Sequence, residues 1–275
     1  MDSKYKIMGL LSLVTVVILI SACIDGGEKK ETLSIAGSTT VQPIAAKAAE
    51  EFMKKNPGVI VSVQGGGSGT GVKMVAEGSA DIGDASRELK ETEKTKYPDL
   101  KPYAIAGDGI AVVAHPANSV SGLTKQQVQD IFSGKITNFK GVGGPDKEIM
   151  VVIREEGSGT RATFEELVMN KGKTANAGDA LQKPSNGAAK AAIAGNENAI
   201  GYIGLGYVDE TVKDLKIDGV TPSTATIKSG AYPISRKLYM ITNGEASGLK
   251  KRFIDFVLSD EGQEIVEEEG FIKIR

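Results

Sequence analysis

The chain of 275 residues contains one cysteine, one histidine and no tryptophan. A disulfide within one chain needs two cysteines, so none forms here, and most metal sites built from His and Cys are disfavoured. Aromatic residues make up only 5%, which disfavours an aromatic platform for sugars or bases. The 33 basic and 35 acidic residues leave a net charge of −2, so the charge gives no reason to expect a nucleic-acid partner. We therefore expect no metal, no cofactor and no nucleic acid.

The N-terminus has the pattern of a targeting signal. Two lysines precede an apolar run at residues 7–20, which is shorter than the roughly 20 residues that span a bilayer. Residues 19–23, Leu-Ile-Ser-Ala-Cys, resemble the lipobox of secreted lipoproteins, which implies cleavage before Cys23 and lipid attachment to its sulfur. The alternative is an uncleaved membrane anchor in which Cys23 is incidental. Both interpretations place the rest of the chain outside the cytoplasm, behind a polar tether at residues 24–31.

The remaining sequence alternates short apolar runs with helical patterns. With 40% hydrophobic and 25% charged residues, its composition is that of an ordinary globular protein. We expect strands at residues 33–36, 59–63, 110–114, 149–153, 200–203 and 238–241. We expect helices at about residues 43–55, after Gly69, Lys125, Arg161 and Gly187, and at 249–258 and 262–268, with Asp260 as a cap. Residues 170–186 are rich in Lys, Gly, Asn and Ala and are interpreted as a surface excursion. The alternation predicts an α/β architecture.

Three turns of small residues follow apolar strands and open helices. They lie at residues 36–40, 65–71 and 156–161. Glycine lets the backbone approach a ligand closely, Ser and Thr supply hydroxyls, and a helix start supplies unpaired N–H groups. Each turn alone is an ordinary N-cap, but three in one chain indicate a site for a tetrahedral oxyanion. None is a P-loop, and none matches the dinucleotide fingerprint.

Arginines near these turns supply positive charge. Arg154 ends the apolar run at residues 149–153, and ligands of open α/β sheets bind beyond the carboxyl ends of strands. Its guanidinium is therefore placed to fork onto two oxygens of an anion. Arg87 follows Ser86 just past another short strand. The alternative for either arginine is a surface ion pair, and this alternative is stronger for Arg161.

In the order and spacing of its motifs, the chain resembles the PstS family, the phosphate-binding proteins of phosphate ABC transporters. The motifs lie at residues 37–40, 66–71, 80–87, 108–113 and 154–161, within a resemblance that covers residues 32–275. The resemblance implies an α/β, two-lobed periplasmic-binding-protein-like clamp of type II, with the ligand cleft between the lobes. It implies lobe I at residues 32–109 plus 238–275 and lobe II at 110–237, with hinges near 109–113 and 236–241.

The family's ligand contacts map onto several positions of this sequence. The implied phosphate contacts are Thr39, Thr40, Ser68, Ser86, Arg154, Ser158, Gly159 and Thr160, with Ser38 and Arg87 as neighbouring contributors. The chain departs from well-known members at Ser86, where they have a carboxylate that accepts the proton of hydrogen phosphate and so rejects sulfate. Asp84 and Asp108 are candidates for a substitute acceptor, and Asp108 is favoured because it lies at the implied hinge. Its alternative role is that of a turn residue before Gly109.

The resemblance implies a monomeric, non-enzymatic lipoprotein that captures inorganic phosphate for the permease subunits of an ABC transporter. Three alternatives stay open. In the first, the bound ion is another oxyanion, such as sulfate, molybdate or tungstate. In the second, the protein is a phosphate sensor or adhesin without a transport role. In the third, it is an enzyme acting on phosphate esters. The sequence shows no carboxylate–histidine constellation for the last, since His115 before Pro116 is typical of a loop.

Overall fold

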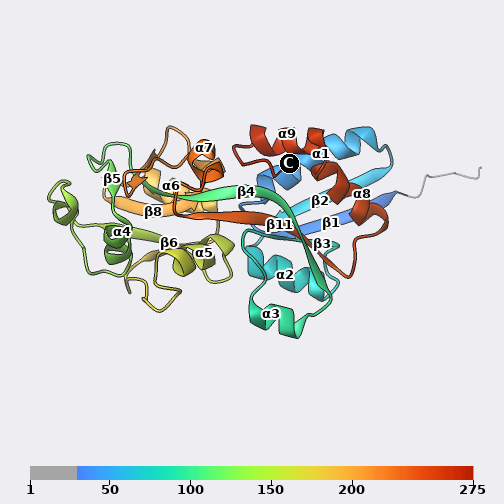
Figure 1. Ribbon diagram of the computed structural model, residues 1–275, viewed down its shortest axis with the longest axis horizontal. Coiled ribbons are helices and arrows are strands. Elements are labelled where there is room, and N and C mark those ends of the chain that lie inside the picture. Colours follow the sequence, from blue (N-terminus) through green and yellow to red (C-terminus); the bar gives the residue numbers. More distant parts are fainter. Residues whose placement is uncertain (1–29, 275) are drawn as a thin grey trace, which may run out of the picture.

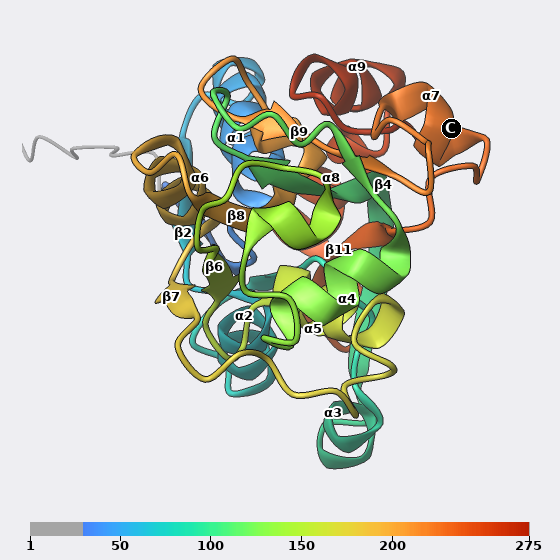
Figure 2. The same ribbon diagram turned by 90° about the vertical axis from the view of Figure 1, so that its left-hand side faces the viewer.

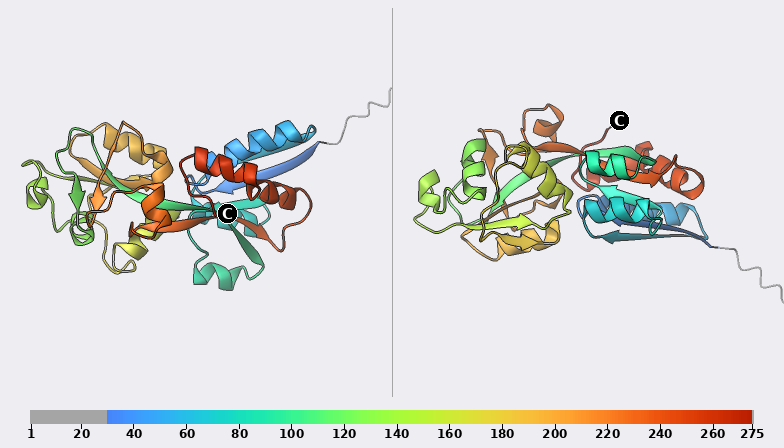
Figure 3. Two further views of the ribbon diagram at one scale, coloured as in Figure 1. Left: turned by 45° about the horizontal axis from the view of Figure 1, so that its top comes forward. Right: turned by 90° about the horizontal axis from the view of Figure 1, so that it is seen from below.

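The computed structural model describes residues 30–274 and shows two α/β lobes connected by two long strands (Figure 1). These strands are β4 (Leu100–Ala114) and β11 (Ser235–Asn243), which pair antiparallel along residues 100–109 of β4. From Ile110 onward β4 pairs instead with a strand of the second lobe. β4 is thus shared by both lobes, as Figure 3 shows from two further directions.

The first lobe is a mixed sheet with helices on both faces. Its strands and helices are β1 (Glu31–Gly37), α1 (Gln42–Lys55), β2 (Val59–Gly65), α2 (Ser68–Ala76), β3 (Ile82–Ala85), α3 (Glu91–Lys96), α8 (Gly248–Val257) and α9 (Asp260–Glu268). The strand order is β2-β1-β3-β11-β4, in which β1 is parallel to β2 and β3. Helices α1, α8 and α9 cover one face, and α2 covers the other (Figure 1). Because the central strands are covered on both sides, they consist largely of apolar residues.

The second lobe extends the order through β4-β8-β6-β7. Its elements are β5 (Gly122–Leu123), α4 (Lys125–Phe132), β6 (Met150–Arg154), α5 (Gly159–Leu167), β7 (Leu181–Lys183), α6 (Asn186–Ala194), β8 (Ala199–Gly204), β9 (Lys213–Asp214), β10 (Lys216–Ile217) and α7 (Thr224–Lys228), with 3-10 turns η1 (Phe139–Val142) and η2 (Leu205–Tyr207). Figure 2 looks onto this lobe, with α4 and α5 on one side of the sheet.

Each lobe has its own apolar core. In the first, Phe52 packs edge-on against Phe253 with ring centroids 5.3 Å apart, which joins α1 to α8. In the second, Phe164 stacks on Tyr202 at 4.1 Å, and Phe132 contacts both rings. The two cores are therefore separate, and the shared strands β4 and β11 connect the lobes that contain them.

The α/β prediction is confirmed, and each of the six expected strands lies within or beside an observed one. Some details differ. The tether is predicted to end at residue 31, but β1 begins at Glu31. The cap of α9 is Ser259, whose hydroxyl accepts from Gly262 N, so the predicted cap Asp260 is already helical. The excursion at 170–186 contains β7. The signal segment and Cys23 lie outside the described residues. Between residues 30 and 274, no helix is long and apolar enough to cross a membrane.

Candidate functional site

The small-residue turns of both lobes meet where the carboxyl ends of β1, β3 and β6 face one another. β1 and β6 each end at a small-residue turn that opens a helix. Hydrogen bonds of Thr40 with Thr160 and of Arg154 with Thr39 join these regions across the lobes. Arg154 ends β6, and Ser86 directly follows β3. Most of the side chains discussed below are buried, so their polar atoms need partners within the protein or a ligand.

Arg154 is 1% exposed and is fixed mainly by its own lobe. Its Nε donates to Lys183 O at 3.1 Å, Nη1 donates to Asn186 Oδ1 at 3.0 Å, and Nη2 donates to Pro184 O at 2.8 Å. Nη2 also reaches Thr39 Oγ1 of the first lobe at 3.3 Å. Burial lowers the pKa of Arg154 to about 10, which still leaves the guanidinium charged at neutral pH.

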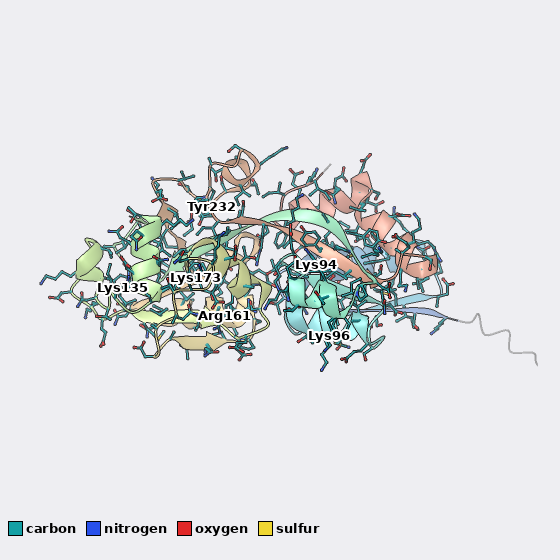
Figure 4. All side chains as sticks on the ribbon, turned by 60° about the horizontal axis from the view of Figure 1, so that its bottom comes forward. Lys94, Lys96, Lys135, Arg161, Lys173 and Tyr232 are labelled. Atoms are coloured by element: carbon teal, nitrogen blue, oxygen red, sulfur yellow. The ribbon has the colours of Figure 1, made fainter. Side chains whose placement is uncertain are left out.

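The turn after β6 opens helix α5. Ser158 is its N-cap, and the Ser158 hydroxyl accepts from Arg161 N at 3.2 Å. Gly159 and Thr160 are the first helical residues and are buried. Their N–H groups are among those that a helix start leaves without an intrahelical acceptor. Arg161 itself turns back to its own lobe, donating to Glu165 at 2.7 Å and to Arg154 O at 3.1 Å (Figure 4 labels it on α5).

The turn after β1 places three buried hydroxyls at the interface between the lobes. Ser38 stabilises the turn itself, because its Oγ accepts from Thr40 N at 3.2 Å. Thr40 Oγ1 lies at the centre of the site, where it is 3.1 Å from Thr160 Oγ1 of the other lobe. It also accepts from Asn186 Nδ2 at 2.9 Å and from Arg236 Nη2 at 3.1 Å.

Ser68 and Ser86 form a second pair of hydroxyls in the first lobe. Ser68 Oγ accepts from Ser86 N at 3.0 Å, and the two Oγ atoms are 3.4 Å apart. Ser86 Oγ also accepts from Arg236 Nη1 at 3.3 Å. A hydroxyl whose lone pairs accept from N–H groups directs its own proton elsewhere. Because the hydroxyl oxygens of Thr40 and Ser86 accept hydrogen bonds from N–H groups, their own O–H protons can be donated to an oxyanion.

The charge balance of the site comes from a buried ion pair. Arg236 is held against Asp108, with Nη2 and Nε at 2.6 and 2.8 Å from Asp108 Oδ2. Burial raises the pKa of Asp108, and the guanidinium and the Leu205 N–H, which donates at 3.2 Å, oppose that rise. The site thus contains two buried guanidiniums, those of Arg154 and Arg236, and the one carboxylate that pairs with Arg236, so this cluster has a net positive charge.

Comparisons with known proteins agree with this geometry. Residues 25–261 match the model of the PBP superfamily domain. The phosphate-binding protein PstS of Bacillus subtilis is 35% identical, with 98% of this chain and 95% of that protein covered. A substrate-binding protein assigned to a phosphate ABC transporter of Clostridium perfringens, solved with bound phosphate, is 43% identical with a TM-score of 0.86, over 89% of this chain and 100% of that one. A phosphate transport receptor from Vibrio cholerae is 35% identical with a TM-score of 0.73, over 88% of this chain and 100% of that one.

The chain belongs to the PstS family. The predicted family and the binding-protein-like fold class are thereby confirmed. The family consists of substrate-binding proteins rather than enzymes.

In this PstS family member, the structure brings together most of the predicted side chains. Those that contact one another across or within the site are Thr39, Thr40, Ser68, Ser86, Arg154 and Thr160, with Ser158 and Gly159 at the same helix start. Arg87 does not join them. Its guanidinium is bound by both oxygens of Glu93, at 2.7 Å each, and by Glu88 O at 2.8 Å, so Arg87 is removed from the predicted site. The carboxylate of Asp84 is buried and has no hydrogen-bond partner among residues 30–274, so it makes no hydrogen bond to these groups.

Three residues of the site were not found from the sequence. The sequence predicts Arg236 only as the first residue of a hinge segment at 236–241. Asn186 fell at the end of the presumed excursion, although Ser-Asn-Gly at 185–187 opens α6 as the other small-residue turns open theirs. Tyr207, on η2, donates its hydroxyl to Thr39 O across the lobes. Only Asn186 has a local sequence signal that points to it.

Proposed function

We propose that the protein captures inorganic phosphate outside the cytoplasm and presents it to an ABC transporter. The observation that supports this most is the convergence of Arg154, Arg236 and the donor-directed hydroxyls of Thr40 and Ser86 from both sides of one buried interface. Relatives that share this fold include a phosphate-bound transporter protein at 43% identity.

The proposed contacts follow from this geometry. The ligand set is Thr39, Thr40, Ser68, Ser86, Arg154, Ser158, Gly159 and Thr160, to which we add Arg236 and Asn186; Ser38 supports the turn. Phosphate near neutral pH carries between one and two negative charges, and its removal from water requires many donors. Because the donors come from both lobes, a bound ion stabilises the closed clamp, and closure is the state that a transporter recognises.

Selectivity is proposed to depend on Asp108. Its Oδ2 is held by Arg236, whereas its Oδ1 has no contact with a guanidinium and accepts the N–H of Leu205. Oδ1 is therefore the atom proposed to accept the phosphate proton. Sulfate has no such proton and meets a carboxylate instead.

We further propose that the protein acts as a monomer, without catalysis and without a cofactor. It is proposed to be anchored to the membrane by lipid on Cys23. Mass spectrometry of the membrane-bound protein tests the anchor, which requires a chain that begins at a lipid-modified Cys23. An intact residue 1–22 segment indicates an uncleaved anchor instead.

The experiment that tests the function is a calorimetric titration of the purified protein with phosphate, sulfate, molybdate and tungstate. Phosphate is expected to bind at one site per chain and more tightly than the others. Tighter binding of another oxyanion would leave the proposed binding-protein role in place but would show that phosphate is not the preferred ligand. Hydrolysis of a phosphate monoester by the protein would favour the enzyme alternative, and loss of the gene with undiminished phosphate uptake would favour a sensor.

A further inference from the structure

The start of helix α2 in the first lobe touches the turn before α5 in the second lobe, backbone against backbone. Gly69 N donates to Gly157 O at 2.9 Å. A Cβ added to Gly69 would lie 3.3 Å from Gly157 Cα and 3.5 Å from Gly157 O. A Cβ added to Gly67 would lie 3.2 Å from the same carbonyl oxygen. At these points the lobes approach so closely that even a Cβ requires its neighbour in the other lobe to shift by a few tenths of an ångström.

Local backbone geometry explains two of these glycines and leaves the third unexplained. Gly67 and Gly157 have φ of +90° and +85°, which favours glycine whatever lies nearby. Gly69 is the second residue of α2 and has no positive φ. Glycine is less favourable than alanine in a helix, so the first lobe by itself gains nothing from glycine at this position.

The atoms nearest to Gly69 show that the contact between the lobes, and not packing within its own lobe, favours glycine at this position. All three atoms that its added Cβ would meet belong to Gly157 of the other lobe. Gly71, two residues on, gives the opposite pattern, since its Cβ would meet Ala36 O, Asp84 O and Gly37 Cα within its own lobe. Gly71 therefore serves the packing of α2 on the sheet, whereas Gly69 has no such role.

The matching helix start in the second lobe repeats the feature. A Cβ on Gly159 would come within 2.3 Å of Ser68 Oγ and 2.5 Å of Ser86 Oγ, both in the first lobe. Two helix starts, one from each lobe, thus approach one another most closely at a glycine of each, Gly69 of α2 and Gly159 of α5.

From this contact we infer that Gly69 is a positioning residue for closure, which sets how closely the lobes approach without itself touching the ligand. The inference rests on the proposed clamp function. The measured affinity of a clamp is its intrinsic affinity multiplied by the fraction that can close, so a side chain at Gly69 lowers the affinity while leaving the groups that contact phosphate intact.

Gly187 offers a matched control. It is the second residue of α6, as Gly69 is of α2, and the nearest atom to its added Cβ is Ser185 Oγ of its own turn, at 3.9 Å. Gly69→Ala, Gly69→Leu, Gly187→Ala and Gly187→Leu are compared by calorimetric phosphate titration, by small-angle X-ray scattering with and without saturating phosphate, and by thermal melting without phosphate.

Gly69→Leu is expected to bind phosphate at least tenfold more weakly than Gly187→Leu and to become less compact in scattering, with an unchanged or higher melting temperature. Gly69→Ala is also expected to bind phosphate more weakly than its control Gly187→Ala, but only by a few-fold. Wild-type affinity and wild-type compaction in Gly69→Leu, or in Gly69→Ala if the leucine variant does not fold, would overturn the inference. Failure of the wild type to bind phosphate would refute the proposed function instead, and the scattering of the ligand-free variants would still decide the role of Gly69.

Discussion

Removal of the Arg154 guanidinium tests the proposed anion site at its most buried charge. Arginine has five N–H donors. In the structure one is bonded to each of Lys183 O, Asn186 Oδ1, Pro184 O and Thr39 Oγ1, which leaves one unassigned. The bond to Thr39 is the longest of the four at 3.3 Å and is the one that a ligand would replace. Arg154 can thus give phosphate one or two hydrogen bonds.

The expected loss follows from that count. A hydrogen bond to a charged group contributes about 1.5–3 kcal/mol, so one or two of them contribute about 1.5–6 kcal/mol. Loss of one partner of a buried charge pair costs about 2–5 kcal/mol, which lies within that range and is the loss expected here. Since 1.4 kcal/mol is tenfold in affinity, Arg154→Ala is expected to weaken phosphate binding by about 30-fold to 4,000-fold. Calorimetric titration at pH 7, where the guanidinium is charged in the wild type, measures this loss directly.

The control for this experiment is Arg87→Ala. Arg87 is 7% exposed, but Glu93 holds its guanidinium, so this variant loses a buried arginine without losing a proposed ligand contact. Its phosphate affinity is expected to stay within about threefold of the wild type, provided that both variants are titrated below their melting temperatures. Equal affinities of Arg154→Ala and the wild type would refute the assignment, and a loss in Arg87→Ala as large as in Arg154→Ala would show that general destabilisation causes both.

Three further predictions concern the acidic residues and their partner. Asp108→Asn is expected to narrow the ratio of phosphate to sulfate affinity, measured by competition titration, because the proposed proton acceptor becomes an amide; an unchanged ratio assigns the proton to another group. Arg236→Gln is expected to lower the free energy of unfolding by about 3–5 kcal/mol, since it leaves Asp108 buried without its partner, and the double variant with Asp108→Asn is expected to regain part of that loss in urea titrations; equal losses in both would show that the pair is not coupled. Burial raises the pKa of Asp84 well above 3.8, so its contribution to stability is full below that pH and falls as the pH rises towards the raised value, by up to about 1.4 kcal/mol per pH unit. Melting curves are therefore expected to show the wild type losing stability relative to Asp84→Asn between pH 4 and neutral pH, and parallel curves would contradict the burial of an unpaired carboxyl.

Features of the fold that depend on neighbouring residues could be predicted from the sequence. The apolar runs become strands because a chain covered on both faces needs apolar residues throughout. The turns at 36–40, 65–71 and 156–161 precede helices as predicted, although only Ser158 in the third caps its helix with a side chain. Arg154 could be placed because it directly ends one of these strands.

Contacts between distant segments could not be predicted in the same way. Arg236 joins the site only because β11 pairs with β4, which brings it beside Asp108, 128 positions earlier in the chain. Arg87 fails for a local reason that the sequence did contain, since Glu93 lies six residues later at the start of α3 and binds its guanidinium. Position next to a site residue is thus a weaker indicator than an available partner.

The most direct test of the central claim is a crystal structure of the protein with bound phosphate. The account predicts one ion enclosed between the lobes, with oxygens within about 3.2 Å of donors on Thr40 or Ser86, on Arg154 and on the first turn of α5. An ion bound to one lobe alone, or bound elsewhere while these groups keep contacting only each other, would contradict it.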